Sequence, residues 1–145
     1  MSKKLYISDS LDYTHVQMML MSEFCVFCMQ NLPVKGDVRI MVVDDREKHG
    51  ISTTGVYHLG RGMLKVYGKN RALSDVLRSI AHELTHMMQD ETGLIQGPVQ
   101  DAGGFHEDQA NARAGEIIKL FAKSKPERNR IYESVIAKIL LSSLT

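Results

Sequence analysis

Residues 71–91 read RALSDVLRSIAHELTHMMQDE, and this stretch determines most of what the sequence predicts about the fold. Its apolar residues recur every three or four positions, so they gather on one arc of a helix: Leu73, Val76, Leu77, Ile80, Leu84, Met87 and Met88. Asn70 or Ser74 is the expected cap at the start, and Gly93 is the expected stop. The stretch therefore predicts an amphipathic helix with one buried face.

The polar side of this helix carries the sequence His82-Glu83-Leu84-Thr85-His86, an HExxH motif. Two histidines four residues apart lie one above the other on a helix, so both imidazoles can reach one metal ion. Glu83 projects beside that position, where its carboxylate can take a proton from a water on the metal. Two unrelated surface histidines would not explain the glutamate. We therefore interpret His82 and His86 as metal ligands and Glu83 as a general base.

A third ligand has to come from elsewhere, because a catalytic zinc ion usually has three protein ligands and one open position. The downstream candidates are Asp101, His106, Glu107, Asp108 and Glu116. Residues 105–123 predict a second helix, with an apolar stripe made of Ala110, Ala114, Ile117, Ile118 and Phe121. Glu107 and Asn111 share one border of this stripe, and His106 lies at the other. We expect Glu107 as the third ligand, Asn111 as a hydrogen-bond partner of a ligand imidazole, and His106 as the alternative ligand.

These two motifs resemble those of the zincin metallopeptidases whose third ligand is a glutamate. The pairing of HELTH at 82–86 with ExxANxxA at 107–114 is most similar to the compact ImmA/IrrE-type and phage-type metallopeptidases. The resemblance covers about residues 55–120 and is most specific at the two motifs. The chain has no clear match to a dedicated residue that stabilises the transition state.

The resemblance implies zinc-dependent hydrolysis of peptide bonds. In that reading Glu83 is the catalytic base, and one Zn²⁺ ion is held by His82, His86 and Glu107. The SprT-like group also has HExxH but uses a histidine as its third ligand, so His106 keeps that alternative open. A non-catalytic alternative is an interaction module stabilised by zinc. Structural zinc sites usually close with four protein ligands, and Glu83 would then have no role, so we favour the enzyme.

The remaining segments predict an α+β fold, in which a small three-stranded sheet packs against the HExxH helix and further helices. We expect one zincin-like domain over residues 1–145. The predicted strands are 37–43, 53–59 and 63–67, with a glycine-containing hairpin at 60–62. The other predicted helices are 14–30 and 127–142, the latter after a capping box at Ser124-Lys125-Pro126-Glu127.

The composition narrows the partners and the compartment. The 145 residues carry a formal net charge of +1 and no basic run, so we expect no nucleic-acid or membrane partner. No stretch has the length of a membrane span, which predicts a cytoplasmic protein, or one acting in a host cytoplasm if it is phage-encoded. The expected partner is a protein or peptide substrate.

The only two cysteines, Cys25 and Cys28, form a CxxC inside the predicted helix 14–30. A zinc ribbon needs a second pair, and a redox CxxC opens a helix after a strand. This pair instead lies in a run rich in Val, Met, Leu and Phe. We therefore expect two buried, reduced thiols that take no part in the metal site.

The sheet and the loop after the HExxH helix predict where a peptide substrate binds. A peptide could add a strand to an exposed edge of the sheet, for which strand 63–67 is the expected edge, with loop 92–104 as one wall of the cleft. Peptide hydrolysis also requires a donor for the oxyanion, and the candidates are His106, Arg113, Tyr57 and Tyr132. A packing or surface role is the simpler interpretation of each. His58, on the strand pair before the HExxH helix, is interpreted as a solvated histidine.

Overall fold

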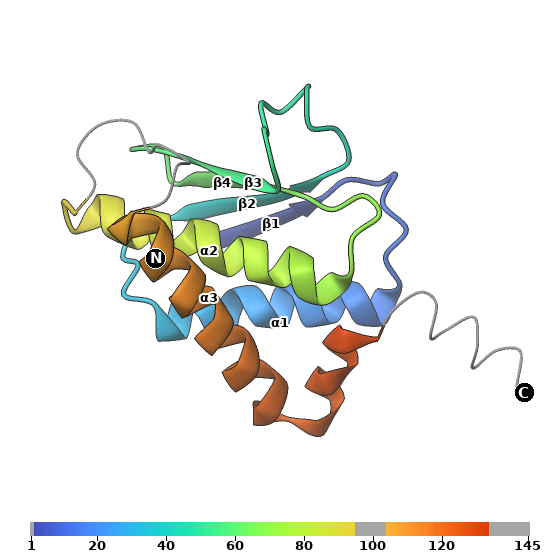
Figure 1. Cartoon of the computed structure of the whole chain (residues 1–145). Coiled ribbons are helices and arrows are strands. Elements are labelled where there is room, and N and C mark those ends of the chain that lie inside the picture. The colour runs from blue at the N-terminus through green and yellow to red at the C-terminus, as the bar shows by residue number, and fades with distance from the viewer. Residues whose placement is uncertain (1, 95–103, 134–145) are drawn as a thin grey trace, which may run out of the picture.

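A four-stranded mixed sheet with helices on one side makes up the fold (Figure 1). The computed structural model describes residues 2–94 and 104–133. The strands are β1 (Lys3–Ile7), β2 (Val38–Val43), β3 (Gly55–His58) and β4 (Met63–Tyr67). The helices are α1 (His15–Asn31), α2 (Leu73–Glu91), α3 (Phe105–Ser124) and the 3₁₀ helix η1 (Pro126–Tyr132). The predicted α+β class is confirmed.

The sheet has one strand more than the three that the sequence predicts. Its order is β1-β2-β4-β3, with β1, β2 and β4 parallel and β3 antiparallel to β4. The additional strand, β1, lies at an edge, and none of its side chains is fully buried. Lysine is common on edge strands because it discourages further pairing. The lysines of β1 therefore weakened the apolar signal on which the prediction relied.

The expectation that strand 63–67 forms the edge is wrong. β4 lies between β2 and β3, and Leu64 and Val66 are fully buried there. The predicted hairpin joins β3 to β4, and Gly62 has a φ of 56° within it. A Cβ atom at Gly62 would clash with the carbonyl oxygen of Asp37, so only glycine lets β4 start so close to β2. Among residues 2–94 and 104–133, β3 pairs with β4 alone, so it forms an edge of the sheet next to α2.

Helix α2 lies under the sheet and forms as its apolar pattern predicts, although its start differs. The expected caps are wrong: Asn70 has a φ of 57° in the preceding turn, Ser74 already lies inside the helix, and the N-cap is Ala72 without a side-chain hydrogen bond. At the other end, Gly93 follows the C-cap with a φ of 75°, which confirms the predicted stop. The apolar face of α2 is buried against the sheet and the other helices.

Helix α1 begins at a capping box made by Thr14 and Gln17 and contributes several buried side chains to the core. Phe24 packs edge-on against Phe121 of α3, with ring centroids 5.1 Å apart. Cys25 and Cys28 are both buried and free, as predicted. Burial raises the pKa of the Cys25 thiol to about 12, so the thiol stays protonated at neutral pH.

The C-terminal segment differs from the predicted helix 127–142 over the residues that the structure describes. Pro126–Tyr132 form a short 3₁₀ helix, η1, and the rest of the predicted helix, from residue 134 on, lies outside the described residues. Ser124 does not cap this helix, because it is the last residue of α3 and its hydroxyl donates to the carbonyl oxygen of Phe121. Ile131 of η1 is fully buried, which holds η1 against the helical layer.

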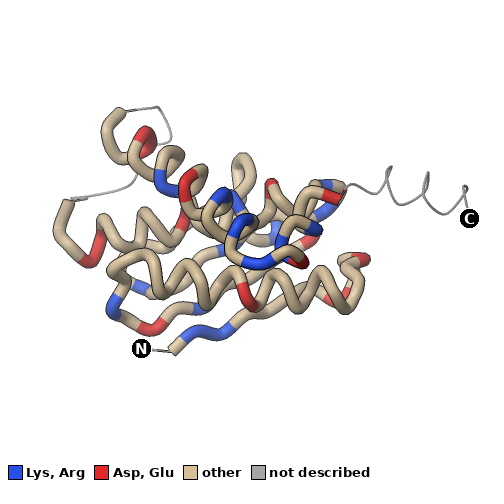
Figure 2. The backbone as a smooth tube through the Cα atoms, turned by 90° about the horizontal axis from the view of Figure 1, so that it is seen from below, with Lys and Arg blue, Asp and Glu red and all other residues tan. Residues whose placement is uncertain are grey.

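Charges of both signs are distributed over the helical layer. In Figure 2 the Lys and Arg positions lie among the Asp and Glu positions on the side that the view shows. Among the described residues, no helix is both long enough and apolar enough to cross a membrane.

Candidate metal centre

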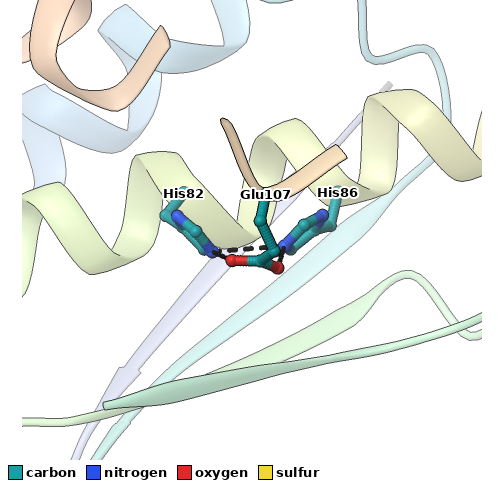
Figure 3. A group of neighbouring side chains, drawn as sticks. All are labelled: His82, His86 and Glu107. Carbon is teal, nitrogen blue, oxygen red and sulfur yellow. Dashed lines mark hydrogen bonds and ion pairs between the residues drawn. The ribbon is translucent and has the colours of Figure 1, made fainter. Parts of the chain in front are cut away.

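His82 and His86 point from α2 toward one common position (Figure 3). Their Nε2 atoms lie 3.2 Å apart, and the two rings are nearly perpendicular at 86°. Two nitrogen ligands at about 2.0–2.1 Å from a tetrahedral ion lie about 3.3 Å from each other. The two histidines are therefore spaced as ligands of a single ion.

Glu107 reaches the same position from the first turn of α3. Its Oε1 lies 2.7 Å from Nε2 of His86, and its Oε2 lies 3.2 Å from Nε2 of His82. Ala110 and Ala114 are fully buried, and their small side chains let α3 pack closely on α2. The structure thus brings together the three predicted ligands in a cluster that could hold a metal ion.

Gln89 supports this cluster, although neither of the two sequence motifs includes it. Its Nε2 donates to the backbone carbonyl of His106 at 3.0 Å and to Oε1 of Gln109 at 2.8 Å. Because a backbone carbonyl can only accept, these bonds orient the Gln89 amide so that its Oε1 faces Nδ1 of His86, 2.8 Å away. The Nδ1 atom must then carry the proton, which leaves the Nε2 lone pair of His86 directed at the cluster.

The i, i+3 spacing of His86 and Gln89 on α2 is the signal that could have identified this partner. A side chain one turn beyond a ligand histidine is well placed to accept from the ring nitrogen that faces away from the metal. Gln89 is fully buried, which is unusual for glutamine and points to a specific role.

His82 is held by Asn111, which the sequence predicts as a hydrogen-bond partner of a ligand imidazole. Asn111 lies one turn after Glu107 on α3 and hydrogen-bonds the His82 side chain. Burial lowers the pKa of His82, and the neighbouring His86 ring lowers it further, while Glu107 and Asn111 act in the opposite direction. The net shift is downward, which favours the neutral imidazole that metal ligation requires.

Glu83 is nearly buried, with 7% of its surface exposed, and it lines the same cleft as the cluster. It packs against Gly55 of β3, where a Cβ atom would lie 3.2 Å from Cγ and 3.3 Å from Oε1 of Glu83. A side chain at Gly55 would therefore crowd the carboxylate of Glu83, and glycine avoids this.

The cleft has a volume of about 690 Å³ and runs along α2. One wall extends from Arg71, just before α2, to His86, and the opposite wall is formed by residues 52–59, which include β3. Glu107 and Asn111 of α3 also line it. The cluster therefore faces a concave surface large enough for an extended ligand.

His106, the alternative third ligand, does not belong to the cluster. Its backbone carbonyl accepts from Gln89, and its ring packs edge-on against Phe105. Of the other candidates, Asp108 and Glu116 are exposed, and Asp101 lies outside the described residues. The structure thus favours Glu107 over His106 at this position.

The candidate oxyanion donors are engaged elsewhere or lie away from the cleft. Tyr57 lines the cleft, but its hydroxyl donates to Oδ2 of Asp90 at 2.6 Å, and burial together with Asp90 raises the pKa of Tyr57. Arg113 pairs with Glu116 and is not among the cleft residues. Tyr132 lies on η1, half exposed and also outside the cleft lining. His58 lines the cleft, and burial lowers its pKa, which favours the neutral ring.

No known protein family matches the chain, and no curated protein is significantly similar to it. The site belongs to a recognisable kind, a candidate metal centre. Two histidines from one helix and one glutamate from a second, packed helix form it. The resemblance to the zincins therefore stays a prediction made from the residues of the two motifs.

Proposed function

We propose that the protein hydrolyses peptide bonds with a zinc ion held by His82, His86 and Glu107. The observation that carries this proposal is the position of Glu83, a nearly buried carboxylate that lines the cleft beside the three candidate ligands. A metal site that only ties two helices together has no use for a carboxylate there.

The donor set supports zinc as the metal. Two imidazole nitrogens and one carboxylate, with a fourth position left for water, are typical of catalytic zinc. All the ligand atoms lie within 4.8 Å of one another, as one small ion requires. The same donors also suit ferrous iron in oxygenases, but redox chemistry on iron does not need an adjacent general base. Glu83 therefore favours zinc.

Each residue of the site has a separate role in the proposed hydrolysis. Zinc bound here would lower the pKa of a water toward about 7 and polarise the scissile carbonyl. Glu83 accepts the proton of the attacking water and passes it to the leaving amine. Gln89 and Asn111 orient the ligand imidazoles, and the packing of α3 on α2 keeps Glu107 in reach.

The substrate strand is best placed on β3. In the part of the chain that the structure describes, this strand is a sheet edge beside α2 with no second strand paired to it, and its residues line the cleft that contains the cluster. An extended peptide can pair with such an edge through backbone hydrogen bonds, which would hold a peptide bond over the metal position. This assignment replaces the strand 63–67, which the structure places inside the sheet.

Glu83→Gln provides the test, because it keeps size and shape but removes the base. Zinc-loaded wild type should cleave members of a broad peptide library, followed by mass spectrometry, and the variant should lose about 10²–10⁴-fold in rate. Zinc content and melting temperature should stay the same in both. If both proteins bind zinc and fold but neither cleaves any peptide, the proposed hydrolysis is wrong and the interaction module becomes the better account.

A further inference from the structure

Two arginines line the cleft toward the N-terminal end of α2, beyond the candidate metal centre. The guanidinium of Arg71 donates to the carbonyl oxygens of Tyr67 (2.8 Å) and Asp75 (3.1 Å) and to the Ser79 hydroxyl (2.9 Å). Arg78 is exposed and has no hydrogen-bond or ion-pair partner among residues 2–94 and 104–133. This end of the cleft therefore has one cation held against its wall and one that is free to bind a ligand.

Helix geometry places these cations about one turn from His82, the nearer of the two histidines of the candidate metal centre. Arg78 precedes His82 by four residues, which is a rise of about 6 Å along α2. Arg71 reaches the same level, because its guanidinium contacts Ser79, next to Arg78 in the chain. An extended peptide advances about 3.3 Å per residue, so the cations lie about two residues from the bond over the metal position.

The direction of β3 determines which side of the substrate meets these arginines. Gly55 lies beside Glu83, whereas Tyr57 and Gly60 both bond to Asp90, so β3 and α2 run in the same direction. Antiparallel pairing is the more stable kind, and a peptide that pairs in this way with β3 runs opposite to α2. The residues after the scissile bond then extend toward Arg78.

We propose that Arg78, together with Arg71, forms a subsite for a carboxylate one or two residues C-terminal to the scissile bond. This inference rests on the proposed peptidase function and specifies its substrate class. The carboxylate belongs either to an acidic side chain or to the C-terminus of a short substrate, and a guanidinium binds both through paired N–H groups. Asp75 also lines this end, so the two arginines leave a net charge of +1 there.

Zinc-anchored probes test this subsite without requiring hydrolysis. A hydroxamate group binds zinc in place of the scissile peptide, and two amino acids attached to it occupy only the C-terminal side. One pair of probes carries leucine followed by aspartate amide or asparagine amide, and a second pair carries leucine and alanine ending in a free carboxylate or an amide. Calorimetry on the zinc-loaded protein then measures the affinity for each probe.

We expect the acidic member of at least one pair to bind about fivefold more tightly to wild type, as one partly exposed charge pair allows. The pair that shows the preference identifies the source of the carboxylate. Arg78→Gln should remove most of the preference, and the control Arg39→Gln, at an exposed position on β2, should keep it.

Equal affinity for acidic and neutral probes, or a preference that survives Arg78→Gln, would overturn the subsite. If no probe binds the zinc-loaded protein, the subsite and the metal centre are both wrong. If the preference is found but no peptide is cleaved, the carboxylate subsite stands and only the proposed hydrolysis fails.

Discussion

Helices α1 and α2 each carry two residues of a type that can bind metal, three or four positions apart. The surroundings of the two pairs differ completely. Cys25 and Cys28 on α1 are fully buried among apolar side chains, and burial raises the pKa of both thiols. His82 and His86 on α2 face a cleft and meet a carboxylate from a second helix. Neither cysteine belongs to a metal-ligand cluster among the described residues.

The comparison shows that spacing on a helix is not enough to make a metal site. A cysteine must lose its proton to bind a metal, and a histidine must be in its neutral form. Either residue also needs further ligands that point to the same position, and that position must be accessible from solvent. The cysteine pair lacks these features, whereas the histidine pair has Glu107 as a third donor and Gln89 and Asn111 as supporting residues.

Removal of the third ligand, Glu107, should show most clearly that zinc binds at the histidine pair of α2 and not at the cysteine pair of α1. Glu107→Ala should reduce zinc affinity by more than the 10- to 100-fold that is usual for loss of a supporting partner, because it removes a ligand. The matched change on α1, Cys28→Ala, should leave zinc affinity unchanged. Competition with a chromogenic chelator measures both. The account fails if zinc is retained in Glu107→Ala but lost in Cys28→Ala or in His106→Ala.

Substitution of Gln89 should have the next largest effect on zinc affinity, because Gln89 determines the tautomer of His86. Gln89→Ala should weaken zinc binding by about 10- to 100-fold, since the proton on Nδ1 of His86 loses its acceptor. Gln89→Glu retains that acceptor and should bind zinc more tightly than the alanine variant. A purely structural role would instead lower the melting temperature of both variants equally, with no difference between them in zinc affinity.

Gly55→Ala should separate catalysis from metal binding. Its new Cβ would press against Cγ and Oε1 of Glu83 and would lie 3.1 Å from the carbonyl oxygen of Lys65. Displacement of the general base by a few tenths of an ångström should lower peptide hydrolysis about tenfold. Zinc affinity should not change, because the atoms nearest to the new Cβ belong to Lys65 and Glu83 and not to the three ligands. Full activity in this variant would contradict the assignment of Glu83 as the base.

The smallest effect concerns the thiols of α1 and appears only at high pH. The pKa of Cys25 is raised from 9.0 to about 12 in the folded protein. Above pH 9 the unfolded chain ionises this thiol while the folded chain does not, so the free energy of unfolding should fall as the pH rises from 9 toward 12. Denaturant titrations at pH 8 and pH 10.5 should show a smaller loss for Cys25→Ala than for wild type. Equal losses would mean that the thiol is not buried as described.

Local patterns in the sequence were sufficient to predict the two helices that carry the candidate site. The apolar arc of α2 placed His82 and His86 on one face, and the apolar stripe of α3 placed Glu107 at its border. Both inferences depend on the helical repeat alone, and the small residues Ala110 and Ala114 indicated a close helix contact. The structure therefore agrees with the sequence-based prediction where the periodicity of a single helix determines which residues share a face.

The errors concern features that depend on contacts between distant segments. β1 pairs in parallel with β2 across the whole of α1, and no local pattern in the chain reports such a partner. The prediction of β4 as the sheet edge is wrong because the strand order depends on which strands pair with β2, and no local pattern in the sequence specifies that pairing. Gln89 was missed because its role depends on the position of His106 on α3.

A crystal structure of the zinc-loaded protein, with an anomalous difference map at the zinc absorption edge, tests the central claim most directly. We expect one peak per chain, about 2.0–2.1 Å from the Nε2 atoms of His82 and His86 and about 2.0–2.2 Å from a carboxylate oxygen of Glu107. Glu83 should lie near the ion without ligating it. A peak coordinated by His106 in place of Glu107, a peak at Cys25 and Cys28, or no peak at saturating zinc would contradict the account.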